Sequence, residues 1–168
     1  AAADVRQLAF NMLAQGVGAE QLTQFISALN DALTRRVIQL NLEKHKFDGI
    51  EWAWLAFGSE GRDEQTFSTD QDNGIVFVPT EGANDEGLKG RFLDFALDVN
   101  RDLDRCGFPL CKGNIMASNP QWCLTLAEWK EQFSTWIRIP QPEALLNATI
   151  FFDFRALYGQ AELADAMK

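Results

Sequence analysis

The chain carries WAWLAFGSEGR at residues 52–62 and DQDNGIVFV at residues 70–78, so a polar segment separates two apolar runs. Both runs have the length and composition of buried β-strands. The connection between them, about fifteen residues, is too short to hold a crossover helix with its loops. The two strands are therefore expected to be antiparallel neighbours in one sheet.

Two carboxylates, Asp70 and Asp72, lie one residue apart just before the second run. On an extended segment, residues i and i+2 point to the same side, so this pair can hold one or two hard cations, Mg²⁺ or Mn²⁺. Ahead of the pair, Gly58 and Ser59 form a small-residue turn whose backbone can approach a phosphate closely. A phosphate cradle beside an acidic pair suits a nucleoside triphosphate. The alternative is a loop in which the aspartates cap backbone amides.

Between two strands and in this order, Gly58-Ser59 followed by Asp70-x-Asp72 resembles the nucleotidyltransferase superfamily that includes DNA polymerase beta and the antibiotic nucleotidyltransferases. The longer string GSEGRDEQTFSTDQDNGIVF is similar to a narrower bacterial group, often fused to CBS-pair or cyclic-nucleotide-binding modules. That group is similar to the uridylyl- and adenylyltransferases that regulate nitrogen metabolism. The resemblance covers most of the chain and continues through CGFP at 106–109, GNIMA at 113–117, Trp129, Trp136 and FDFR at 152–155.

The resemblance implies that the domain moves a nucleoside monophosphate from a nucleoside triphosphate to an acceptor, in a signalling or regulatory setting. A protein is one candidate acceptor. The superfamily has a third carboxylate on a later strand, for which Asp153 is the best candidate, so Asp70, Asp72 and Asp153 are the expected catalytic and metal-binding residues. A charge in the apolar run 150–155 is costly unless it is used or paired, and the alternative for Asp153 is an ion pair with an arginine, Arg155 or Arg62.

The triphosphate is expected to meet Gly58, Ser59 and the adjacent backbone amide at its β- and γ-phosphates. Arg62 is expected to balance triphosphate charge, and pairing with Glu64 or Asp70 is an equal alternative.

Other residues have both a functional and a structural interpretation. Lys112 and Gly113 form a second small-residue turn that would approach the nucleotide or the acceptor. Asn73 either orients Asp72 or belongs to a turn. Trp129 and Trp136, seven residues apart on an expected helix, are favoured as core residues over a base-stacking platform.

Composition narrows the functional classes. The chain has 168 residues, 46% of them hydrophobic, which fits one domain with a real core. Its net charge of -9 argues against a nucleic-acid partner, which would need a basic face. No apolar run approaches the roughly 20 residues of a membrane span, so no membrane partner is expected. The odd count of cysteines, Cys106, Cys111 and Cys123, indicates free thiols packed in a cytoplasmic protein rather than a metal site.

Hydrophobic periodicity predicts an α+β domain: a mixed sheet with helices packed mainly on one face. The resemblance implies the same palm-like nucleotidyltransferase fold. The expected helices are 4–15, 19–46, 88–105, 124–136 and 162–168, and the expected strands are 52–57, 74–78, 114–117 and 148–154.

Residues 1–48 are expected to form an N-terminal helical brace or the end of a linker from an upstream regulatory domain, and residues 49–168 the catalytic domain. The superfamily usually has a further, often helical, region that grips nucleotide and acceptor. The chain ends about fifteen residues after Asp153, so this C-terminal half is expected to be missing and the isolated piece to transfer poorly. The alternatives are a non-catalytic regulatory nucleotide-binding module and an interaction domain whose metal site has decayed.

Overall fold

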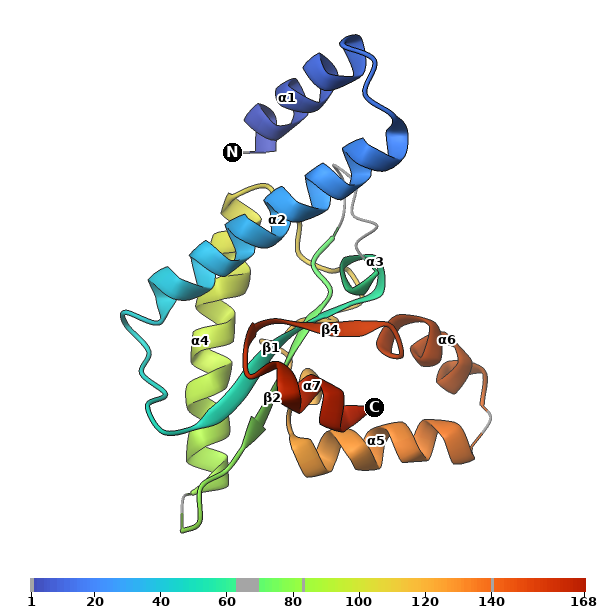
Figure 1. Ribbon diagram of the computed structural model, residues 1–168. Helices are drawn as coiled ribbons and strands as arrows, with labels where there is room; N and C mark the ends of the chain where they lie inside the picture. Colours follow the sequence, from blue (N-terminus) through green and yellow to red (C-terminus); the bar gives the residue numbers. More distant parts are fainter. Residues whose placement is uncertain (1, 63–69, 83, 140) are drawn as a thin grey trace.

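The computed structural model (Figure 1) describes residues 2–62, 70–82, 84–139 and 141–168, without the side chains of residues 2, 59, 60 and 148. Within these residues, four strands form a mixed sheet in the order β3-β2-β1-β4. They are β1 (Glu51–Phe57), β2 (Asn73–Val78), β3 (Cys123–Thr125) and β4 (Phe154–Gly159). β1 pairs antiparallel with β2 and β4, whereas β2 and β3 are parallel. The mixed sheet and the antiparallel pairing of the first two strands are confirmed.

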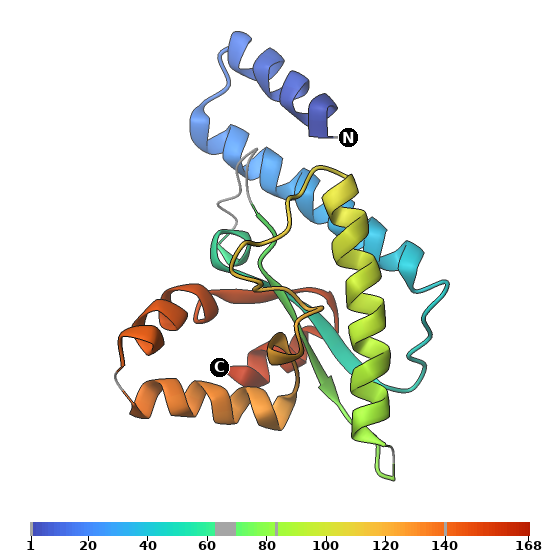
Figure 2. The same cartoon turned by 180° about the vertical axis from the view of Figure 1, so that it is seen from behind.

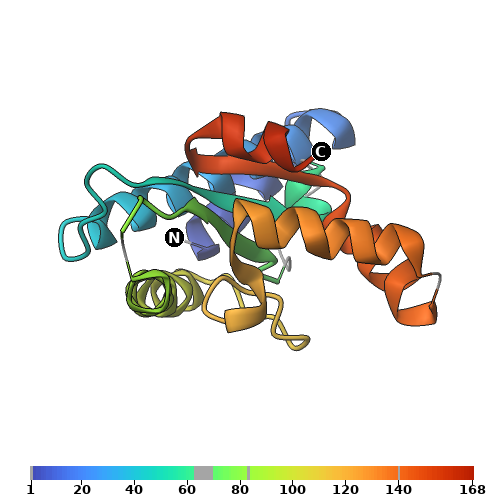
Figure 3. The same cartoon turned by 90° about the horizontal axis from the view of Figure 1, so that it is seen from below.

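Helices cover both faces of the sheet. α2 and α4 pack on one face, and α5 and α7 pack on the other (Figures 2 and 3). The helices of the described residues are α1 (Ala2–Ala14), α2 (Ala19–Asn41), the short α3 (Gly58–Gly61), α4 (Asp85–Arg105), α5 (Leu126–Arg138), α6 (Pro142–Phe151) and α7 (Ala161–Met167), with a 3₁₀ turn, η1 (Pro120–Trp122). The α+β class is confirmed, but the helices do not lie mainly on one face.

The composition of β1 explains this difference. Residues 52–57 are all 6% exposed or less. Even-numbered residues such as Trp54 pack with α2 and α4, and odd-numbered residues such as Leu55 pack with α5 and α7. A strand that is apolar at every position, and not only at alternate positions, needs cover on both faces.

Two strand predictions are wrong. Residues 114–117 contain turns and a bend, and the third strand is β3. Residues 148–154 are mostly helical, because α6 continues to Phe151 and β4 begins only at Phe154. Pro142 stands at the first helical position and the helix formers 144–146 follow, so the helix extends into an apolar run that fits either structure. Asp153 therefore lies in the bend between α6 and β4, and not inside a strand.

The N-terminal helices form as expected, although α2 ends at Asn41 and not at residue 46. α1 packs on α2 through a small apolar cluster separate from the main core (Figure 1). Two polar contacts join α2 to β4: Arg155 Nη2 donates to Asp31 Oδ1 at 2.8 Å, and Arg35 Nε donates to the Leu157 carbonyl oxygen at 2.9 Å. None of the helices described is both long and apolar enough to span a membrane.

Candidate functional site

A glycine turn follows the last residue of β1. Gly58 has a φ of 57°, in the left-handed region that side chains disfavour, and the chain turns there into α3. A Cβ added at Gly58 would lie 3.5 Å from Asp72 Oδ2. The Phe57 N–H also donates to the Asp72 carbonyl oxygen at 3.0 Å. The turn and Asp72 therefore lie together at one end of the β1–β2 pair.

The acidic pair alternates with two buried amides. Gln71 and Asn73 are 1% and 2% exposed and face α4, whereas Asp70 and Asp72 are half-buried. Burial raises the pKa of Asp72 to about 6; a hydrogen bond from Cys111 opposes this rise and the charge of Asp70 adds to it. An influence of Asp70 on the neighbouring carboxylate is the behaviour expected of two like charges held close together.

Cys111 is a neighbour that sequence reasoning missed. Its thiol donates to Asp72 Oδ1, with Sγ at 3.4 Å from the oxygen. Burial is also the main cause that raises the pKa of the Cys111 thiol, which keeps it a neutral donor at neutral pH. All three cysteines are free, and Cys123 is buried in the core. No signal in the spacing could have found this contact, because 39 residues separate the two partners.

Asp153 lies beside the turn, but its carboxylate is paired with Arg62. Arg62 Nη1 is 3.2 Å from Asp153 Oδ2, and both side chains are more than a third exposed. A Cβ on Gly61 would lie 2.3 Å from the Asp153 carbonyl oxygen, so α3 packs directly on this backbone. The other suggested partner, Arg155, binds Asp31 instead.

The structure thus places Gly58 beside Asp72, whose carboxylate feels the charge of Asp70, and it places Asp153 and Arg62 next to the same turn as a pair. Across the described parts of the chain, no three carboxylate, histidine or cysteine side chains form a group suited to a metal ion. The metal-binding role expected of Asp70, Asp72 and Asp153 stays a prediction. The side chain of Ser59 and the whole of Glu64 lie outside the described residues.

The other candidates have structural surroundings. Asn73 is the first residue of β2, and its side-chain oxygen accepts hydrogen bonds on the α4 side. Lys112 and Gly113 form an exposed turn next to Cys111. Trp129 is fully buried in the core, where its indole N–H donates to the Ile75 carbonyl oxygen at 2.9 Å, and Trp136 packs against the same cluster. The interpretation of both tryptophans as core residues is confirmed.

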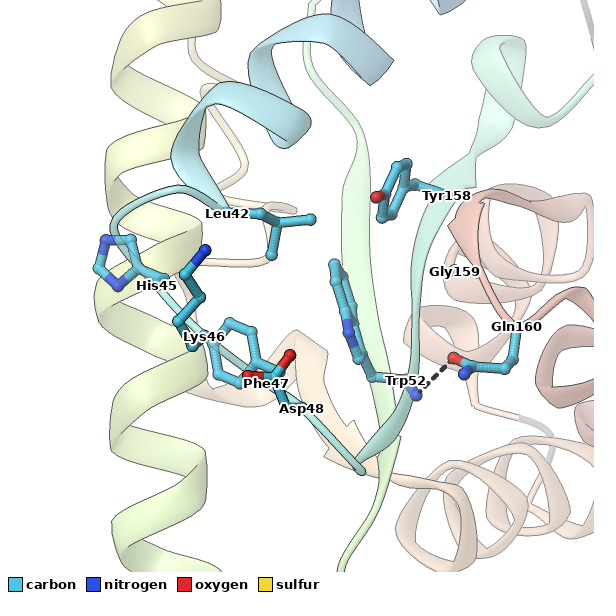
Figure 4. Close-up of a pocket in the computed structure, with 9 residues that line it drawn as sticks. All are labelled: Leu42, His45, Lys46, Phe47, Asp48, Trp52, Tyr158, Gly159 and Gln160. Carbon is cyan, nitrogen blue, oxygen red and sulfur yellow. Dashed lines mark hydrogen bonds between the residues drawn. The ribbon is translucent and has the colours of Figure 1, made fainter.

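A cavity of about 550 Å³ lies at the opposite end of β1. Figure 4 shows Trp52 and Tyr158 on one side of it and Leu42 and Phe47 on the other. The Trp52 N–H donates to Gln160 Oε1 at 2.9 Å, which fixes the start of β1 to the end of β4. None of the residues suggested by the sequence lines this cavity.

Over residues 3–143, the sequence matches the model of a protein family described as "Putative nucleotidyltransferase DUF294". The chain belongs to the DUF294 family. The match includes the Gly58 turn and the pair Asp70 and Asp72, and it ends before Asp153. None of the curated proteins matches the sequence. Family membership supports a nucleotidyltransferase-like domain.

Proposed function

We propose that this DUF294 domain transfers a nucleoside monophosphate from a nucleoside triphosphate, bound with Mg²⁺ or Mn²⁺, to an acceptor in a regulatory setting. The observation that carries the proposal is the Gly58 turn beside the Asp72 carboxylate, where a Cβ on Gly58 would lie 3.5 Å from Oδ2, within the residues that match the family. A backbone turn without a Cβ beside an acidic pair can accept a phosphate on one side and a cation on the other.

The donor set fits a hard divalent cation. Mg²⁺ is commonly held by one or two protein carboxylates, with substrate phosphates and water as the other ligands, so Asp70 and Asp72 suffice as protein ligands. When bound, the ion neutralises the leaving pyrophosphate and activates the acceptor hydroxyl. The ionised form of Asp72 is unfavourable on its own, because burial and the charge of Asp70 both raise its pKa. A bound cation would offset this cost.

An exposed ion pair between Arg62 and Asp153 also lies at the turn. We infer that Arg62 binds triphosphate oxygens through its guanidinium, which matches phosphate geometry, and releases Asp153 as it does so. Asp153 would then be available to accept the proton of the acceptor hydroxyl. The exchange requires little energy, since an exposed ion pair contributes at most about 1 kcal/mol.

The acceptor is an uncharged or basic hydroxyl-bearing group, and a protein side chain is the favoured class. The net charge of -9 would repel a polynucleotide. The second candidate function is a regulatory module that binds the nucleotide without transfer. The observation that favours it is the carboxylate of Asp153, which is bonded to Arg62 and not to the acidic pair.

Calorimetry of each nucleoside triphosphate with and without Mg²⁺ tests the binding step, and the transfer step is followed by release of labelled pyrophosphate from γ-labelled triphosphate. Asp72→Asn is expected to abolish the Mg²⁺ dependence of binding. Asp48→Asn is the matched control, since Asp48 is an exposed aspartate at the other end of β1. Mg²⁺-dependent affinity that is equal in Asp72→Asn and wild type removes Asp72 from the metal site. Tight binding without any transfer, by this chain and by a longer one that continues beyond residue 168, supports the regulatory module.

A further inference from the structure

Three buried amides join the start of β2 to helix α4. Gln71, Asn73 and Asn100 are 1%, 2% and 1% exposed. Asn100 Nδ2 donates to Gln71 Oε1 at 2.9 Å and to Asn73 Oδ1 at 3.0 Å. Gln71 Nε2 donates in return to the Asn100 carbonyl oxygen at 2.9 Å. Through these bonds α4 holds both chain neighbours of Asp72.

The same amides anchor the segment that follows α4. Gln71 Nε2 donates to the Phe108 carbonyl oxygen at 3.0 Å, at the beginning of the segment. At its end, the Ala117 N–H donates to Asn73 Oδ1 at 2.8 Å and the Ser118 N–H donates to Asn100 Oδ1 at 3.1 Å. Two main-chain bonds reinforce these contacts, from the Gln71 N–H to the Pro109 carbonyl oxygen and from the Asn73 N–H to the Ile115 carbonyl oxygen.

The segment 108–118 is therefore held at both ends, and its middle carries Cys111 to within 3.4 Å of Asp72 Oδ1. A buried amide network adds little net stability compared with apolar side chains of the same shape. What a fully bonded network does provide is a single fixed geometry, because each broken bond would leave a polar atom unpaired away from water. Here the geometry that it fixes is that of the Asp72 backbone and of the segment beside it.

We propose that Asn100 is a positioning residue for the site: from α4 it holds the main chain on both sides of Asp72 and the segment 108–118 against the carboxylate. The inference rests on the proposed function, since it assigns Asn100 to the same nucleotide and metal site. Asn100 acts through its neighbours and contacts neither ligand. Loss of a residue that orients a metal ligand typically lowers metal affinity about 10- to 100-fold, and this range is the expected effect.

The test compares Asn100→Ala with Asn41→Ala. Asn41 is a matched control: it is an asparagine of α2 that is 2% exposed, and its Nδ2 donates to the Val37 carbonyl oxygen and to Asp102. Both changes remove a buried amide and are expected to lower Tm. The measured quantity is the factor by which Mg²⁺ raises the affinity for ATP. Only Asn100→Ala is expected to reduce this factor, by about 10- to 100-fold. The electron paramagnetic resonance spectrum of Mn²⁺ bound together with ATP should change in Asn100→Ala. In Asn41→Ala it should be the same as in wild type.

A second measurement needs no variant and applies even if Asn100→Ala does not fold. In the wild-type protein, the alkylation rates of the cysteines are followed separately by mass spectrometry. ATP with Mg²⁺ is expected to slow alkylation of Cys111 and to leave Cys106, which is similarly half-buried, unchanged. An unchanged rate at Cys111 on saturation with nucleotide would show that the segment does not line the site.

The outcomes separate this inference from the proposed function. If the wild-type protein binds no triphosphate in a Mg²⁺-dependent way, the proposed function fails, and the role of Asn100 fails with it. If Mg²⁺ raises the affinity for ATP by the same factor in wild type, Asn41→Ala and Asn100→Ala, the proposed function stands and the positioning role of Asn100 is wrong.

Discussion

The two ends of β1 have different chemical surroundings. At its start, Trp52 and Tyr158 face Leu42 and Phe47 across a cavity, and Trp52 is hydrogen-bonded to Gln160 through its backbone. A glycine with a positive φ lies at each end, Gly159 at the start and Gly58 at the other, but Gly58 lies beside the half-buried carboxylate of Asp72, which accepts a hydrogen bond from a thiol. Active sites tend to retain groups that disfavour folding, whereas structural regions do not. The contrast therefore favours the Gly58 end as the site of chemistry, although a cavity of about 550 Å³ lies at the other end.

The largest expected loss of stability comes from replacing either of two glycines, one at each end of β1, by alanine. A Cβ on Gly61 would lie 2.3 Å from the Asp153 carbonyl oxygen, and a Cβ on Gly159 would lie 2.3 Å from the Trp52 carbonyl oxygen. Each change to alanine is expected to lower the free energy of unfolding by about 3 kcal/mol, because backbone must move in both. Urea denaturation measures this loss.

Only Gly61→Ala is expected to weaken the binding of ATP with Mg²⁺ as well, by about tenfold or more, since it displaces the turn at the site. Gly90→Ala is the control: Gly90 lies within α4 with nothing near its added Cβ, so this change should stabilise by about 0.5–1 kcal/mol. Equal loss of ATP affinity in Gly61→Ala and Gly159→Ala would mean that the two ends of β1 do not differ in their effect on ATP binding.

A smaller effect is expected for Asp72→Asn, which should stabilise the metal-free protein at neutral pH by about 1 kcal/mol. The sign follows from the pKa of Asp72, which is raised to about 6 in the folded protein. The unfolded chain has a pKa of about 3.9 for aspartate, so between about pH 4 and pH 6 the folded state binds more protons and wild-type stability falls as pH rises.

The asparagine variant lacks this titration. Its advantage in Tm over wild type should therefore be absent near pH 4, grow up to about pH 6 and stay constant above that. Thermal unfolding in a chelating buffer at several pH values measures the difference. A Tm advantage that does not vary with pH would mean that Asp72 is not held in an unfavourable ionised state.

The smallest expected change in stability belongs to Arg62→Ala. Its pair with Asp153 is exposed, with 39% and 54% of the two side chains accessible, so the free energy of unfolding should change by less than about 1 kcal/mol. The affinity for ATP with Mg²⁺ should nevertheless fall severalfold, because a guanidinium is lost from the phosphate site. Arg105→Ala removes a comparable exposed pair, with Asp102, and should leave ATP binding unchanged. Equal affinities in both variants would assign Arg62 a purely structural role.

The sequence was sufficient to predict the strands and helices that have a clear hydrophobic period. The strands at 52–57 and 74–78, their antiparallel pairing and the helices that became α2, α4 and α5 follow from hydrophobic period and from one short connection. β3 has only three residues, which is too few to show a hydrophobic period. The run that became the end of α6, residues 148–151, is short and apolar except for Thr149, so its period could not separate helix from strand.

The site was predictable to the extent that it is local. Gly58 and Asp72 are close in the sequence, and the pairing of β1 with β2 brings them together in space. The contact of Cys111 with Asp72 and the bonds of Asn100 to Gln71 and Asn73 were not predictable, because they join residues that are 27 to 39 positions apart. An asparagine in an amphipathic helix gives no sign in the sequence of the partner that it will meet.

The order of strands in the sheet has a consequence for how the chain is made. β1 is flanked by β2 and by β4, and its pairing with β4 joins Phe57 to Phe154. During synthesis, the edge of β1 that receives β4 stays open until about a hundred further residues have left the ribosome. An apolar strand with an unpaired edge is prone to pair with other chains. The nascent domain should therefore depend on chaperone protection until residues 154–159 emerge.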